Sequence, residues 1–208
     1  MRIALIDYQA GNLTSVKKAF AAVGADLFVP DDPGDLGRAA AVVVPGVGHF
    51  AATAALTNAW VDAIRAGVDQ GRPLLGICLG MQWLFERSDE APDHPGLGVL
   101  TGRCYRLHGE AGGASFKIPH VGWNALELKR PDSIVHDVMA GAQVYFTHSF
   151  VAPMSEDTVA VTTHGEPFAS IVQRGHVAGV QFHPEKSGDV GLTILRNFLR
   201  LVDGQGQV

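Results

Sequence analysis

Short apolar runs alternate with helical patterns through the first half of the chain. Four of the runs predict buried strands, over residues 3–7, 26–29, 41–44 and 73–77. Short runs of this kind, rich in Val, Ile and Leu and bounded by turn residues, are typical of strands buried on both faces. Between them, apolar residues recur at helical spacing over residues 12–23 and 50–66. The alternation predicts a parallel sheet with helices on both faces.

The pattern changes in the second half, where strand-like runs outnumber helical ones. They cover residues 99–107, 125–128, 143–150, 158–163, 169–173 and 177–182. We expect some of them to pair as antiparallel strands beside the main sheet, and an amphipathic helix over residues 189–202 to follow. The prediction is one α/β domain over residues 1–208, with a central, mostly parallel sheet flanked by helices and additional antiparallel strands in the second half.

The composition argues against several classes of function. Hydrophobic residues make up 47% of the 208 residues and charged residues 18%, which is typical of a compact protein. The net charge of −5, without any Lys/Arg cluster, argues against nucleic acid or an anionic membrane as a partner. No apolar run is long enough to span a bilayer, and the N-terminal run is too short for a signal peptide. With two cysteines and no zinc-ligand spacing, we expect no disulfide, no metal, no cofactor and a cytoplasmic location.

Cys78 is the strongest candidate for a catalytic residue. It follows the apolar run at residues 73–77, stands between Gly76 and Gly80, and precedes helix-forming residues. This pattern is that of a nucleophile elbow, a sharp strand-to-helix turn whose helix start favours a thiolate. The alternative is a small buried cysteine at the end of a core strand. Cys104 does not stand between such a pair of glycines, and we interpret it as structural.

A cysteine nucleophile needs a base and a group that orients the base. His183 ends the apolar run at residues 177–182, and Glu185 follows two residues later. Because residues two apart in an extended chain point to the same side, Glu185 is expected to reach the imidazole, with Pro184 limiting the backbone between them. The alternative is a turn histidine at a strand end. His49, beside a glycine loop, is the nearest competitor among the other histidines.

Acyl transfer also requires donors for the oxyanion. In an elbow, one donor is the N–H after the nucleophile, which here belongs to Leu79. The loop after a neighbouring strand, residues 45–48, is placed to supply the second donor, and Val47 is the candidate within it. An ordinary strand-to-helix turn would explain the same glycines.

Two of these segments together resemble the class I, or triad-type, glutamine amidotransferases. They are Gly-Ile-Cys-Leu-Gly-Met-Gln at residues 76–82 and Gln-Phe-His-Pro-Glu at residues 181–185. Further segments narrow the resemblance to members that supply ammonia for histidine biosynthesis. These are residues 7–8, 11–12, 45–48, 117–124, 145–150 and 186–187, together with Met81. The resemblance extends from the first strand to about Ser187, and the closing helix fits it as well.

The resemblance implies a reaction on glutamine. Cys78 attacks the side-chain amide carbon, and His183, oriented by Glu185, takes the thiol proton and passes a proton to the leaving ammonia. Water then hydrolyses the glutamyl thioester. The resemblance also implies the residues that hold glutamine, with Glu90 on its α-ammonium and the backbone of Ser149 and Phe150 on its α-carboxylate. The full set is Gly46, Gly48, Gln82, Glu90, Ser149 and Phe150. From the residues alone, Glu90 could equally be a solvated acid.

The resemblance implies a protein partner as well. Ammonia passes to a (β/α)₈-barrel cyclase subunit in a heterodimer, and seven residues are expected at or near that interface: Asn12, Lys117, His120, Trp123, Asn124, Tyr145 and Lys186. We interpret residues 117–124 as an exposed docking loop, because Pro119 and Gly122 interrupt a strand there. The alternative is a turn whose indole packs inward.

Val47 stands where many sister glutaminases carry a second glycine. A β-branched residue adopts positive φ poorly, so the hypothesis is an incomplete oxyanion hole and low activity in the isolated subunit. Three other functions remain open from the sequence. They are a glutaminase feeding another synthase, such as that of pyridoxal phosphate, a non-catalytic interaction protein on this fold, and a hydrolase of an ester or peptide bond.

Overall fold

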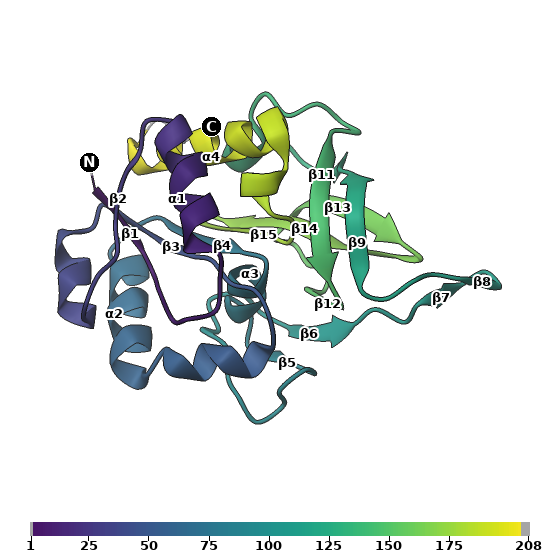
Figure 1. Cartoon of the computed structure of the whole chain (residues 1–208), viewed down its shortest axis with the longest axis horizontal. Helices are drawn as coiled ribbons and strands as arrows, with labels where there is room; N and C mark the ends of the chain where they lie inside the picture. The colour runs from purple at the N-terminus through teal and green to yellow at the C-terminus, as the bar shows by residue number, and fades with distance from the viewer. Residues whose placement is uncertain (1, 205–208) are drawn as a thin grey trace.

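An eight-stranded sheet forms the centre of the computed structural model, which describes residues 2–204 (Figure 1). The strand order is β10-β13-β14-β15-β4-β3-β1-β2. The strands are β1 (Arg2–Leu5), β2 (Asp26–Phe28), β3 (Ala41–Val44), β4 (Leu74–Ile77), β10 (Glu127–Leu128), β13 (Thr158–His164), β14 (Glu166–Arg174) and β15 (Val177–Val180). Strands β2, β1, β3, β4 and β15 pair in parallel, whereas β14, β13 and β10 continue the sheet in antiparallel fashion. The predicted fold class is confirmed.

Helices cover both faces of the sheet. They are α1 (Leu13–Ala22), α2 (Asn58–Asp69), α3 (Leu79–Trp83) and α4 (Gly188–Val202), with 3₁₀ turns η1 (Pro33–Arg38), η2 (Phe50–Ala55), η3 (Ser133–Val135) and η4 (Pro184–Lys186). Helices α1 and α4 bury Phe20 and Phe198 on one face, and α2 and α3 bury Ile64 and Trp83 on the other (Figure 1). Within residues 2–204, no helix is long and apolar enough to cross a membrane.

The single helix predicted over residues 50–66 is wrong, because the chain forms η2 and then α2 there. Leu56 leaves the helical conformation at ψ 81°, and Thr57 starts the next helix from ψ 167°. Thr and Asn are weak helix formers in the interior of a helix and are favoured at its start, so Thr57-Asn58 divides an otherwise continuous apolar pattern.

Shorter strands form a layer beside the main sheet. Strand β9 (His120–Ala125) pairs with β11 (Gln143–His148), while β12 (Phe150–Val151), β6 (Arg103–Arg106) and β5 (Arg87–Ser88) form a second small sheet. Strands β7 (Glu110–Ala111) and β8 (Ala114–Ser115) form a hairpin that projects from the body (Figure 1).

The predicted docking loop at residues 117–124 is a strand over most of its length. All six residues of β9 pair with β11 in continuous antiparallel register. Pro119 precedes the strand and so removes no donor from its ladder. Gly122 takes a φ of +136°, a conformation that residues with a side chain rarely adopt, so glycine lets the strand continue there.

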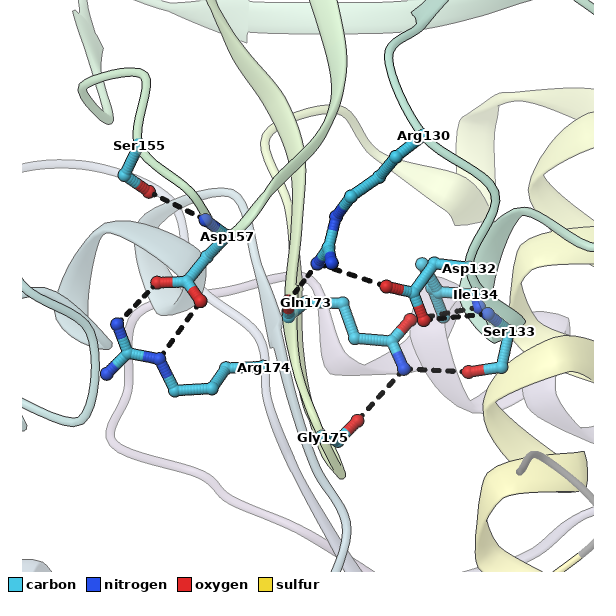
Figure 2. A network of polar contacts seen from close by, with 9 residues as sticks. All are labelled: Arg130, Asp132, Ser133, Ile134, Ser155, Asp157, Gln173, Arg174 and Gly175. Atoms are coloured by element: carbon cyan, nitrogen blue, oxygen red, sulfur yellow. Dashed lines mark hydrogen bonds and ion pairs between the residues drawn. The ribbon is translucent and has the colours of Figure 1, made fainter. Parts of the chain in front are cut away.

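A network of polar contacts fastens the turn between β14 and β15 at one end of the sheet (Figure 2). Arg174 donates to both carboxylate oxygens of Asp157, over 2.9 and 2.6 Å. The side-chain amide of Gln173 donates to Ser133 Oγ over 2.7 Å and accepts from the Ile134 N–H over 3.0 Å. These contacts join the turn to Asp157, which directly precedes β13 in the sequence, and to η3. They lie at the end of β15 that is remote from Cys78.

Candidate active site

Cys78 occupies a strained turn between β4 and α3. Its φ is +53°, a value that non-glycine residues seldom adopt, and it is the residue that precedes the first turn of α3. The two flanking glycines are required by close packing. A Cβ on Gly76 would lie 2.6 Å from the carbonyl oxygen of Gly80, and one on Gly80 would lie 1.8 Å from that of Val44. The sharp strand-to-helix turn predicted from these glycines is therefore present.

The neighbouring strand places a histidine beside this cysteine. Strands β4 and β15 run parallel with Ile77 opposite Val180, so the chain leaves both strands at the same edge of the sheet. Nδ1 of His183 lies 2.8 Å from Oε1 of Glu185, and the two side chains are 2% and 4% exposed. The extended geometry predicted for residues 183–185 is wrong, because Pro184 begins the 3₁₀ turn η4. This turn, rather than strand pleating, brings the carboxylate to the ring.

The charge state of His183 follows from opposing effects. Burial lowers its pKa, whereas its interactions with Cys78 and Glu185 raise it, and the balance is a pKa of about 10. The imidazolium is thus favoured at neutral pH. Nε2 of His183 and Oε2 of Glu185 are buried and make no hydrogen bond of normal geometry within the described residues. The ring nitrogen that does not face Glu185 is available for proton transfer.

Both expected oxyanion donors are engaged within the chain. The Val47 N–H donates to the carbonyl oxygen of Ala10 over 3.0 Å. The Leu79 N–H donates to the carbonyl oxygen of Gly46 over 3.3 Å. These contacts involve both ends of the same Gly46–Val47 peptide group. In this orientation the peptide points its N–H away from the site and its oxygen at the other donor.

A cavity of about 200 Å³ adjoins Cys78. Its lining residues are Val47, Gly48, Cys78, Leu79, Gln82, Glu90, Pro119, Thr147, His148, Ser149 and Phe150. Most residues expected to hold glutamine are among them. Gly46 is not, because it is buried against Tyr8, whose hydroxyl would lie 2.0 Å from a Cβ at this position. The volume suits a small polar metabolite rather than a drug-sized ligand.

Two polar side chains of the cavity are held in place by hydrogen bonds. Oε2 of Glu90 accepts from the Phe50 N–H over 2.7 Å. Gln82 Nε2 donates to the Phe150 carbonyl over 2.8 Å and to Gln181 Oε1 over 3.2 Å. Glu90 is therefore a half-buried carboxylate at a cavity wall, and the alternative of a fully solvated acid does not describe it.

Sequence reasoning missed two groups near Cys78. Gln181 is fully buried, and its Nε2 contacts Cys78 Sγ at 3.7 Å. Its signal was a polar residue inside the apolar run at residues 177–182. The hydroxyl of Tyr8 is buried and unpartnered within the described residues, and burial together with Cys78 raises the pKa of this phenol. In the sequence, Tyr8 was marked only by its place after the first strand and by belonging to residues 7–8, one of the segments that carry the family resemblance, and neither assigned it a role.

The residues expected at a protein interface divide into exposed and buried groups. Trp123 is 56% exposed, and its ring meets that of Tyr145 edge-on at 6.1 Å. Lys186 lies over the same tyrosine at 5.7 Å from the ring centre. Asn12 and Lys117 are exposed, and Asn124 is half-buried. The alternative of an inward-packed indole is wrong, since the indole of Trp123 faces outward.

His120 does not lie on the surface, contrary to the prediction. It is 3% exposed, and its ring stacks on Phe146 at 4.8 Å and on His164 at 4.0 Å. The reason is the strand itself, since neighbouring positions of a strand point to opposite faces and His120 points inward. Within residues 2–204, no group of three or more His, Cys, Asp or Glu side chains is arranged to hold a metal ion.

A second, larger cavity lies at the opposite end of the sheet. It has a volume of about 1270 Å³ and is lined in part by Arg130, Asp132 and Gln173 of the network in Figure 2. None of the predicted site residues lines it. Cys78 and Cys104 are both free and buried. We therefore take the smaller cavity beside Cys78 as the candidate active site, because chemistry rather than size decides the choice.

Comparison with known proteins places these features in a family. The model of the family "Glutamine amidotransferase class-I" matches residues 4–202. The relative "Imidazole glycerol phosphate synthase subunit HisH" of Moorella thermoacetica is 45% identical over 208 residues, covering 98% of this chain and 97% of its own. The protein of the same name from Geobacillus kaustophilus is 44% identical over 209 residues, covering 98% and 99%.

Solved structures of low sequence identity share the fold. One, described as a glutamine amidotransferase, aligns with a TM-score of 0.74 at 23% identity, covering 96% of this chain and 98% of its own. Another, described as PurLQS from Thermotoga maritima, aligns with a TM-score of 0.74 at 18% identity, covering 96% and 97%. At such identities the likeness concerns the architecture alone.

Proposed function

The chain belongs to the class-I glutamine amidotransferase family, and on that premise we propose that it is the glutaminase subunit of an imidazole glycerol phosphate synthase. It hydrolyses glutamine to glutamate and ammonia. The ammonia serves the synthesis of imidazole glycerol phosphate, with an aminoimidazole carboxamide ribotide as by-product, in histidine biosynthesis. The proposal is carried by one observation: relatives of that name are 44–45% identical over nearly the whole chain.

The geometry at Cys78 supports a thioester mechanism. With His183 as imidazolium, the Cys78 thiolate attacks the side-chain amide carbon of glutamine. His183 donates its proton to the departing nitrogen, so ammonia leaves and a glutamyl thioester remains. His183 then takes a proton from the attacking water, and the C–S bond breaks to release glutamate and the thiolate. Glu185 holds the imidazole in the required orientation throughout.

The cavity offers one group for each end of glutamine. We assign the carboxylate of Glu90, anchored by the Phe50 N–H, to the α-ammonium. The backbone of Ser149 and Phe150 is assigned to the α-carboxylate, and Gln82 and Gly48 complete the wall. The side-chain amide then points toward Cys78. Gly46 shapes the loop but does not line the cavity, so we assign it no direct contact.

The oxyanion loop supports a regulated glutaminase. Rotation of the single Gly46–Val47 peptide would turn the Val47 N–H inward and remove the Gly46 oxygen from the Leu79 N–H, freeing both donors at once. One missing donor reduces kcat by about 10²–10³ in other acyl-transfer enzymes. We infer that the isolated subunit has low activity and that binding of the partner turns this peptide.

The partner that we propose is a (β/α)₈-barrel cyclase. The exposed faces of Trp123, Tyr145 and Lys186 form an aromatic and cationic patch beside the cavity segment 147–150. Aromatic side chains of this kind are enriched at protein interfaces. The heterodimer would enclose the cavity and keep ammonia from water. Two free cysteines fit a cytoplasmic location for the complex.

The direct test is co-purification with the cyclase, followed by glutaminase assays. The isolated chain should hydrolyse glutamine slowly, and the complex with the cyclase ligand should do so at least about 10²-fold faster. The reaction should pass through a glutamyl thioester on Cys78. In a His183→Asn variant this intermediate should be visible by mass spectrometry as a protein carrying one added glutamyl group. A chain that neither binds the cyclase nor hydrolyses glutamine in its presence would refute the proposed function.

A further inference from the structure

Two buried histidines connect the partner-facing strand β9 with the wall of the cavity. His120 of β9 and His148 of β11 are directly paired across the two strands. Nδ1 of His120 lies 3.2 Å from Nε2 of His148, and the residues are 3% and 7% exposed. His148 lines the cavity, whereas His120 lies behind it.

The contacts fix which ring nitrogens carry protons. Nδ1 of His148 lies 3.1 Å from the carbonyl oxygen of Phe150, which can only accept, so this nitrogen is the donor. In a neutral ring, Nε2 of His148 is then an acceptor, and Nδ1 of His120 donates to it. Nε2 of His120 is the remaining acceptor, and Asn124 Nδ2 lies 3.4 Å from it. The hydrogen bonds therefore run in one direction, from Asn124 through His120 and His148 to the Phe150 carbonyl.

The surroundings keep both rings neutral, as this arrangement requires. Burial and the facing His164 lower the pKa of His120 to about 4. Burial, His120, His164 and His183 lower the pKa of His148 to about 3, against the opposite effect of the Phe150 carbonyl. The direction of the hydrogen bonds is therefore the same across the neutral pH range.

The Phe150 carbonyl is held from two sides. His148 donates to it from one side, and Gln82 Nε2 donates from the other over 2.8 Å. Gln82 in turn reaches Gln181, whose amide contacts Cys78 Sγ at 3.7 Å. The orientation of the 147–150 segment, which lines the cavity, thus depends on donors from β11 and α3 together.

We propose that His120 and His148 are positioning residues for glutamine, which hold the cavity wall at residues 147–150 in its binding orientation. The proposal rests on the proposed glutaminase function. Their effect is exerted on substrate binding, because the hydrogen bonds of the two rings lead to the Phe150 carbonyl and not to Cys78 or His183. Removal of the donors should raise KM for glutamine and leave kcat nearly unchanged.

The test compares variants of His148 in the complex with the cyclase. Asn places an amide nitrogen where His148 has Nδ1, so His148→Asn retains the donor to Phe150, whereas His148→Leu removes it. We expect His148→Leu to raise KM about tenfold with kcat within about threefold, and His148→Asn to stay within about threefold of the native KM. Equal effects of Asn and Leu, or an unchanged KM in His148→Leu, overturn the proposal.

Two further variants separate positioning from general destabilisation. His120→Phe keeps the aromatic stack on Phe146 but removes the donor to His148, and it should raise KM about fivefold. His120→Phe also tests the proposal if His148→Leu fails to fold. His176→Leu is the matched control, since a ring nitrogen of His176 also bonds a carbonyl, that of Val68 at 2.8 Å, at the remote end of β15. A KM raised equally by His176→Leu overturns the proposal.

The activity of the native complex distinguishes the positioning proposal from the proposed glutaminase function. If the native complex does not hydrolyse glutamine, both proposals fail. If it does, and the His148 and His120 variants leave KM unchanged, only the positioning proposal fails. Imidazole ¹⁵N shifts give a second readout, in which His148 should appear as the neutral tautomer protonated at Nδ1 from pH 8 to pH 5. Protonation at Nε2 in this range also overturns the proposal.

Discussion

Buried polar side chains lie at both ends of strand β15, but only at one end do most of them have hydrogen-bond partners within the chain. At the β14–β15 turn, Arg174 pairs with both oxygens of Asp157, and Gln173 bonds through both atoms of its amide (Figure 2). At the other end, the Tyr8 hydroxyl, His183 Nε2 and Glu185 Oε2 are buried without a partner among the described residues. One atom at the first end, Nε of Arg130, also lacks a partner among the described residues. We assign the first end to the fold and propose the second as the substrate site.

This difference has an energetic meaning. A buried polar group without a partner destabilises a fold by about 1–3 kcal/mol, so natural proteins retain few of them. The catalytic end also holds Cys78 at a φ of +53° and the Gly46–Val47 peptide, whose N–H is turned away from the site. Changes at this end should alter activity far more than stability, and changes at the turn should do the reverse.

The largest effect is expected at the nucleophile. Cys78→Ala should reduce glutamine hydrolysis by at least about 10⁴-fold, because no other thiol lies at the cavity. The free energy of unfolding should change by less than about 1 kcal/mol. Steady-state kinetics and urea unfolding measure the two quantities. Cys104→Ala is the control, since this thiol is buried outside the cavity lining and its loss should affect stability rather than the reaction.

How far the sequence predicted this division depends on the range of the interactions involved. The strand runs, the elbow at Cys78 and the His183–Glu185 pair are local, because they depend on residues only a few positions apart. The burial of His120 is not local, since it depends on a pairing with β11 and on stacking against Phe146. The contact of Gln181 with Cys78 spans 103 positions, and no local pattern encodes it.

Two different causes, one local and one long-range, explain the elements that were predicted wrongly. The break at Thr57 follows from weak helix formers that a hydrophobic period does not register. Strand β9 contains Gly122 and follows Pro119, which are residues that favour a loop, and only its continuous pairing with β11 keeps it extended. Tertiary contacts decided both the fold of this segment and the direction of its side chains.

A smaller loss of activity is expected when the orienting carboxylate is neutralised. Glu185→Gln should lower kcat by roughly 10³-fold, because an amide neither fixes the imidazole tautomer nor stabilises the imidazolium. The pKa of His183 should fall from about 10, since one of the interactions that raise it is lost. The pH dependence of kcat measures the shift. Glu127→Gln is the control, because Glu127 belongs to an exposed ion pair with Lys129. This variant should leave the dependence of kcat on pH unchanged.

The oxyanion loop should respond in the opposite direction. Val47→Gly removes the side chain that opposes rotation of the Gly46–Val47 peptide, so glutamine hydrolysis by the isolated chain should rise about 10–100-fold. Val47→Ala retains a Cβ and should change the rate by less than about threefold. Comparable increases in both variants would show that side-chain bulk, rather than backbone freedom, restrains the loop.

Acid should destabilise the folded chain through the two buried histidines of the catalytic end. In the folded chain the pKa values of His120 and His148 are about 4 and 3, below the usual 6.5, so the unfolded chain binds protons first as the pH falls. Their contribution to stability is present above about pH 6.5 and is lost toward pH 4, with a slope approaching 1.4 kcal/mol per pH unit for each ring. Urea unfolding of His148→Leu, measured between pH 8 and pH 5, should show a smaller slope than the native chain.

The smallest effect is expected at the turn, and it should fall on stability alone. Asp157→Asn weakens the two hydrogen bonds from Arg174. The Asp157 side chain is 9% exposed and that of Arg174 is 44% exposed, so the free energy of unfolding should fall by about 1–2 kcal/mol. Asp26→Asn, in an exposed pair with Arg2, should change it by less than about 0.5 kcal/mol. The kcat and KM of both variants should match the native complex. Loss of glutaminase activity in Asp157→Asn at unchanged stability would contradict the division between the two ends, because it would require the turn to act on the cavity along the whole length of β15.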